Sequence, residues 1–106
     1  MIFIVVKFPV KPEFADEWIE RTASFTEATL AEEGNKFFEW SRSVKDPNEF
    51  VLVEAFEDNA AEAHVTSEHF AQAMETMRPM LRETPRIISR VIEGEGWDAM
   101  GELQID

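Results

Sequence analysis

Apolar and polar positions along this chain follow an order that predicts strand, helix, strand, strand, helix, strand. Residues Ile2–Phe8 form an almost entirely apolar run, typical of a strand that is buried on both faces. Pro9 ends this strand, and Pro12 suits the first turn of a helix. Apolar positions then recur at steps of three and four residues, which predicts a helix of roughly 20 residues. Gly34 is placed to end this helix in the left-handed conformation, and Glu32 is expected on a face away from the apolar stripe.

The next two strands are expected to form a hairpin. Residues Lys36–Val44 and Phe50–Phe56 are rich in apolar side chains, and the turn signal Asp46–Asn48 separates them. Successive side chains of a strand point to opposite faces, so one side of the hairpin collects aromatic, aliphatic and charged residues together. The residues expected on this helix-facing side are Phe38, Trp40, Arg42, Phe50, Leu52, Glu54 and Phe56.

Two helices and a last strand complete the pattern. Asp58 or Asn59 is expected to cap a short helix over Ala60–His64, and Ser67 is expected to cap the helix that follows. Residues Arg86–Ile92 read as the fourth strand. Helices on one face of a four-stranded antiparallel sheet give the ferredoxin-like βαββαβ sandwich of the α+β class.

The opposite face of this sheet has no cover from the same chain. It is expected to carry Val51, Val53 and Ala55, and pairing of two copies through this face would bury them, which predicts a homodimer. Residues 1–92 are therefore expected to form the domain. Residues 93–106 contain Gly94, Gly96 and Gly101 but also Trp97, Met100, Leu103 and Ile105, and are expected to form an arm that packs on the domain or on the partner subunit.

Composition narrows the classes of function. The 106 residues predict one domain, and 22 acidic against 10 basic residues give a net charge of −12, which opposes binding to nucleic acid or an anionic membrane. The absence of cysteine excludes disulfides and thiolate chemistry. No signal peptide and no apolar run of membrane-spanning length are apparent, so a cytoplasmic protein is expected. Neither a metal-binding spacing nor a dinucleotide fingerprint is present, so no metal site and no cofactor are expected.

The candidate chemistry lies between the third strand and the helices that follow it. Glu54 faces the helices, where a carboxylate needs a partner, and His64 starts the next element. Imidazole titrates near neutral pH, so His64 is a candidate general base that Glu54 would orient. Alternatively, the pair forms only a structural hydrogen bond between helix and strand. His69, the other histidine of the chain, is expected to be a partly exposed helix residue.

Several side chains on the same side are candidates to line a substrate pocket. Phe38, Trp40 and Phe70 would supply aromatic walls and Met74 an adaptable filler, although all four suit a core equally well. Arg42 is expected either to hold an anionic substrate or to lie at the sheet edge with its charged end in water.

One combination of residues is similar to a known family. Glu33–Gly34, Phe38, Phe50–Phe56, Ala63–His64 and Ser67–Phe70 together resemble the antibiotic biosynthesis monooxygenase domain, over residues 2 to about 92. The resemblance implies the dimeric α+β barrel fold. The family includes cofactor-free oxygenases of phenolic polyketides and quinols, haem-degrading enzymes, an isomerase of a phosphorylated sugar-like signal molecule, and members with no assigned reaction.

Departures from the family patterns argue against the haem-degrading branch and change the expected shape of the pocket. The haem-degrading branch has an asparagine on its first strand, a tryptophan at the position of His64 and a histidine near the position of Met74, so haem breakdown is not expected here. Lys36 stands where the family usually has an apolar residue, and Trp40 is larger than the usual aliphatic side chain. The pocket is therefore expected to differ in shape from that of other members.

Three functions remain open from the sequence. The leading hypothesis is a cofactor-independent monooxygenase of a small aromatic quinol, phenol or polyketide-like substrate, with His64 as base and Glu54 as its orienting acid. The second is an isomerase of a small carbonyl compound that uses the same base and consumes no oxygen. The third is a non-catalytic dimeric domain that binds a ligand or serves in a stress response.

Overall fold

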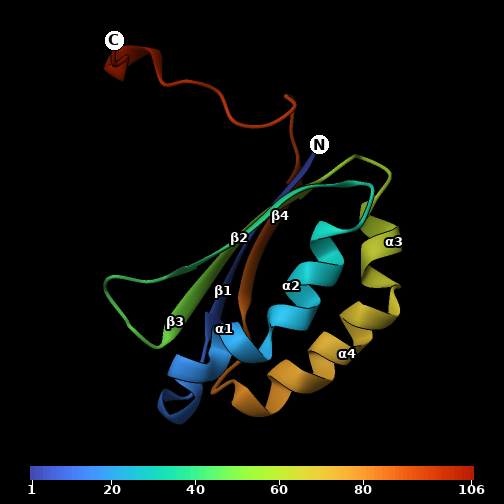
Figure 1. Cartoon of the computed structure of the whole chain (residues 1–106), viewed down its shortest axis with the longest axis vertical. Helices are drawn as coiled ribbons and strands as arrows, with labels where there is room; N and C mark the ends of the chain where they lie inside the picture. The colour runs from blue at the N-terminus through green and yellow to red at the C-terminus, as the bar shows by residue number, and fades with distance from the viewer.

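The computed structural model describes all 106 residues, and its helices pack on one side of a single antiparallel sheet (Figure 1). The strands lie side by side in the order β2-β3-β1-β4, which confirms the predicted ferredoxin-like α+β fold. No helix has the length and apolar character that crossing a membrane requires. The strands are β1 (Ile2–Pro9), β2 (Asn35–Arg42), β3 (Glu49–Phe56) and β4 (Arg86–Val91). The helical segments are η1 (Pro12–Glu17), α1 (Trp18–Arg21), α2 (Ala23–Leu30), α3 (Ala61–Val65), α4 (Glu68–Met77), η2 (Arg78–Met80) and η3 (Gly101–Leu103).

The β2–β3 hairpin has the alternation that the sequence predicts. Phe38 lies opposite Glu54 and Trp40 lies opposite Leu52, so these four side chains share the helix-facing side. The core fills the space between this side of the sheet and the helices. Its buried members are Val6, Phe8, Val10, Ala15, Trp18, Phe25, Phe38, Phe50, Leu52, Ala73, Met77 and Met80.

The first helical region is not the continuous helix that the spacing predicts. It consists of η1, α1 and α2, and Thr22 interrupts the helical backbone between the last two with a ψ of 3°. The Thr22 hydroxyl is buried and donates a hydrogen bond to the carbonyl oxygen of Trp18 at 2.8 Å. A β-branched hydroxyl residue that bonds back to the preceding turn bends a helix. The bend allows Trp18 and Phe25, on either side of it, both to reach the core.

Gly34 serves a different purpose from the predicted one. Only Gly94 and Gly96 have positive φ angles, so Gly34 does not end α2 in the left-handed conformation. A Cβ atom at Gly34 would instead lie 2.2 Å from the Cβ of Ala60. Glycine is therefore required because the loop after α2 passes very close to the start of α3.

Of the two predicted helix caps in the second half, one is confirmed and one is wrong. The Oγ of Ser67 accepts a hydrogen bond from the backbone N–H of Phe70, which caps α4 as expected. The N-cap of α3 is Ala60, and it has no side-chain cap. Asp58 instead forms a 2.9 Å ion pair with the N-terminal ammonium, which draws it away from the helix start.

The edge strand β4 and the C-terminal segment leave apolar side chains in contact with solvent. All six residues of β4 are exposed, including Ile87, Ile88 and Val91. Residues 93–106 extend away from the sheet (Figure 1). Trp97 packs against Phe37 with ring centroids 5.4 Å apart, although most of its surface stays exposed. Residues 93–106 therefore form an arm whose apolar side chains have little cover from the rest of the domain.

Candidate active site

An apolar cavity of about 260 Å³ lies between the sheet and the helices. Its only ionisable side chains are Glu54, from β3, and His64, from α3. A mostly apolar wall with a few convergent polar groups is the usual composition of a small-molecule site. The lining residues are Ile4, Val6, Phe8, Phe25, Leu52, Glu54, His64, Val65, Phe70, Met74, Met77, Pro85 and Ile87.

The predicted site residues divide into two groups. His64, Glu54, Phe70 and Met74 line the cavity. Phe38, Trp40 and Arg42 are not among the lining residues.

Each of these three residues has other partners. Phe38 packs edge-on against Phe25, with ring centroids 5.5 Å apart. The Trp40 indole donates a hydrogen bond to the Thr26 hydroxyl at 2.9 Å. Arg42 pairs with Asp16 at 2.9 Å at the exposed edge of the sheet. Phe38 and Trp40 thus belong to the packing of the domain, and Arg42 lies at the sheet edge, outside the cavity lining.

Glu54 is a buried carboxyl group without a hydrogen-bond partner on Oε1. Its side chain is 7% exposed. Burial and, to a smaller extent, the negative charge of nearby Glu32 together raise the pKa of Glu54 from its ordinary value of 4.5 to about 7. Near neutral pH the group therefore exchanges a proton readily, a property that buried carboxyl groups at reactive sites share.

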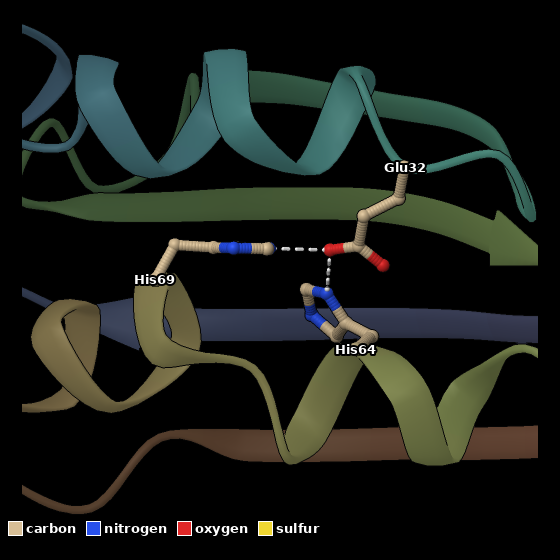
Figure 2. Close-up of side chains that lie close together, drawn as sticks. All are labelled: Glu32, His64 and His69. Atoms are coloured by element: carbon tan, nitrogen blue, oxygen red, sulfur yellow. Dashed lines mark hydrogen bonds and ion pairs between the residues drawn. The ribbon is translucent and has the colours of Figure 1, made fainter.

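The expected hydrogen bond between Glu54 and His64 is absent. The Oε1 of Glu54 lies 3.9 Å from the Nε2 of His64, beyond hydrogen-bonding distance. His64 uses its other nitrogen, Nδ1, which lies 2.7 Å from the Oε2 of Glu32 (Figure 2). A carboxylate oxygen can only accept, so this bond places the imidazole proton on Nδ1 and leaves a lone pair on Nε2. That lone pair is on the side of the ring that faces Glu54.

Glu32 also contacts the second histidine. The Nε2 of His69 lies 2.6 Å from the same Oε2 atom, so two imidazoles converge on one carboxylate oxygen (Figure 2). One ligand-type atom from each of Glu32, His64 and His69 lies within 4.8 Å of the other two. These three side chains are therefore potential ligands of a metal ion. The spacing of residues along the sequence did not indicate such a group.

Sequence reasoning missed Glu32 because its contacts are distant along the chain. His64 is 32 residues away and His69 is 37 residues away. The helical periodicity placed Glu32 away from the core, but α2 ends at Leu30 and Glu32 lies in the turn beyond it. The available signal was the two histidines on either side of Ser67. The Ser67 hydroxyl donates a hydrogen bond to the carbonyl oxygen of His64 and accepts one from the N–H of Phe70, so it joins the end of α3 to the start of α4.

The comparisons with known proteins agree with this fold. The sequence profile described as antibiotic biosynthesis monooxygenase matches residues 1–76. The Bacillus subtilis (strain 168) protein named "Putative monooxygenase YcnE" is 34% identical over 71 residues, which are 66% of this chain and 75% of that protein. The solved structure named "Putative antibiotic biosynthesis monooxygenase from Nitrosomonas europaea" is similar over 86% of this chain and 97% of its own, with 27% identity and a TM-score of 0.79.

A second solved structure extends the likeness in fold. The Deinococcus radiodurans protein of the same description aligns with 95% of this chain and 100% of its own, with a TM-score of 0.81 at 20% identity. The profile match covers more than half of the sequence and includes His64, Glu54 and Glu32. The chain belongs to the antibiotic biosynthesis monooxygenase family.

Proposed function

We propose that this protein is a cofactor-independent monooxygenase that oxidises a small aromatic quinol or phenol bound in the apolar cavity. The observation that carries the proposal is the placement of His64. Its side chain is 6% exposed, it lines the cavity, and its Nδ1 is held by Glu32 at 2.7 Å. An imidazole that a carboxylate holds in this way is oriented as a general base.

The residues of the site have distinct roles in this reaction. His64 Nε2 accepts the proton of a phenolic hydroxyl, and Glu32 stabilises the imidazolium that forms. The aromatic ring of the substrate lies among Phe70, Met74 and the aliphatic wall. Glu54 shares the cavity and returns a proton to the oxygen atom that leaves as water.

The chemistry balances with oxygen as the only co-substrate. The quinolate passes one electron to O₂, and the resulting semiquinone and superoxide combine to form a carbon–oxygen bond. Cleavage of the O–O bond in this hydroperoxide then leaves one oxygen atom on the ring and releases the other as water. A quinol and O₂ thereby give a hydroxyquinone and water.

The test is oxygen uptake with a panel of quinols, followed by product analysis. His64→Ala should abolish uptake while its circular dichroism spectrum matches that of the wild type. Glu62→Ala, at an exposed position of the same short helix, is the matched control and should retain turnover. Unchanged uptake in His64→Ala would remove His64 from the mechanism. Isomerised carbonyl product without oxygen consumption would support the isomerase, and ligand binding without product would support a non-catalytic domain.

The open face of the sheet supports the proposal that two copies associate. Ile88 lies on this face, opposite Val5 of β1, and is 63% exposed. A second chain packed across this face would cover Ile88, and residues 93–106 would gain a surface to pack on. Light scattering should give the mass of two chains, and the mass of a single chain would contradict the dimer.

A further inference from the structure

We propose that Glu32, His64 and His69 bind a divalent transition-metal ion such as Zn²⁺, and that the bound ion disables His64 as a base. The binding site is argued from the geometry of these three side chains alone. The effect on His64 rests on the proposed function, so the two parts are tested separately.

The three side chains converge from separate elements. Glu32 lies in the turn after α2, His64 belongs to α3 and His69 to α4 (Figure 2). Their ligand-type atoms all lie within 4.8 Å of one another. Nitrogen and oxygen ligands bind Zn²⁺ at about 2 Å, which places ligand atoms of one ion roughly 3 Å or slightly more apart. The Oε2 of Glu32 lies 2.7 Å and 2.6 Å from the two nitrogens, so these atoms must move apart by roughly half an ångström to admit the ion.

The surroundings of the group favour a cation. Two imidazoles and a carboxylate form a donor set that suits Zn²⁺ and neighbouring transition metals. No lysine or arginine pairs with Glu32, whose ion-pair partners are the two histidines alone. The side chains of Glu32 and His64 are 16% and 6% exposed, whereas His69 is 27% exposed and offers a route of entry from solvent.

Glu54 supplies a second, independent observation. Metal-bound histidines usually donate their other ring N–H to a carboxylate. The Oε1 of Glu54 is buried, has no hydrogen-bond partner, and lies 3.9 Å from the Nε2 of His64. An ion on Nδ1 requires the proton of the neutral imidazole to lie on Nε2. A small approach of the two side chains from 3.9 Å would then give this carboxyl oxygen a donor.

The same tautomer removes the base. When the ion occupies Nδ1, the Nε2 atom carries a hydrogen and has no lone pair for a substrate proton. Glu32 and His69 do not line the cavity, so the ion sits on the other side of the imidazole from the substrate. The ion therefore acts as an inhibitor rather than as a partner in oxygen chemistry.

Binding is tested on the full chain with Zn²⁺ by calorimetry and with Co²⁺ by visible absorption. The wild type should bind one ion per chain and give the visible bands of a Co²⁺–imidazole complex. Glu32→Gln and His69→Ala should each bind at least about tenfold more weakly. Glu68→Gln removes an exposed carboxylate beside His69 and is the matched control, which should bind like the wild type. Equal affinity in the wild type and His69→Ala would overturn the site.

The effect on His64 has a readout that does not depend on turnover. Nitrogen-15 NMR of the imidazoles should show His64 protonated on Nδ1 in the metal-free protein and on Nε2 with Zn²⁺ bound. Oxygen uptake by the wild type should fall in proportion to occupancy, whereas His69→Ala should keep its own metal-free rate at the same Zn²⁺ concentration. An unchanged tautomer, or full turnover at full occupancy, would overturn the inhibition while leaving the site intact. Absence of uptake in every protein without Zn²⁺ would instead refute the proposed function, and NMR would still decide the tautomer.

Discussion

Replacement of Glu54 by glutamine should change how the stability of this protein depends on pH. Burial and, to a smaller extent, the charge of Glu32 raise the pKa of Glu54 from 4.5 to about 7, so the folded protein holds this proton more tightly than the unfolded chain. The stabilisation from the proton is complete below pH 4.5 and is lost as the pH rises through 7. Each unit of difference between the two pKa values corresponds to about 1.4 kcal/mol in the free energy of unfolding. The shift from 4.5 to about 7 therefore amounts to roughly 3 kcal/mol. Glutamine has nearly the same shape and carries no proton to lose.

Urea unfolding at a series of pH values from 4 to 8, at fixed protein concentration, measures this effect. The free energy of unfolding of the wild type, minus that of Glu54→Gln, should fall by about 3 kcal/mol across the series. Taking the difference cancels the titration of groups that both proteins share. Glu62→Gln, on the exposed side of α3, controls for the loss of one carboxylate charge. A difference that stays constant with pH would refute the interpretation that Glu54 is protonated because it is buried without a partner.

Three further predictions follow from particular contacts. Gly34→Ala should lower the free energy of unfolding by about 1–3 kcal/mol in urea melts, because the new methyl group would meet Ala60. Ala60→Gly in that background should restore part of the loss, and no restoration would mean that another contact is responsible. Ser67→Ala should cost about 1 kcal/mol through loss of the α4 cap, and an unchanged denaturation midpoint would show that the cap is energetically silent. Glu32→Gln should lower kcat for the quinol substrate by about a hundredfold with little change in KM, because it weakens stabilisation of the imidazolium. A change confined to KM would argue that Glu32 shapes the cavity instead.

Local patterns in the sequence account for much of the fold. Alternation along β3 is a property of the extended backbone, so it correctly placed Glu54 on the helix-facing side. The Ser67 cap depends on atoms three residues apart, so it too was predictable. The break at Thr22 was not, because the helical spacing of apolar residues continues across it. Whether a threonine bends a helix depends on the surface against which that helix packs.

The sequence by itself determined the order of the elements and the face of the sheet on which each strand residue lies. It also singled out an acid, Glu54, and a base, His64, and both line the cavity. Only the tertiary structure decided their partners. The closure of the turn after α2 against the start of α3, which Gly34 permits, brings Glu32 to both histidines across 32 and 37 residues of chain. The hydrogen bond from His64 goes to this carboxylate and leaves Glu54 unpaired. Contacts between distant segments depend on how the helices pack together, and no spacing within a single segment records that.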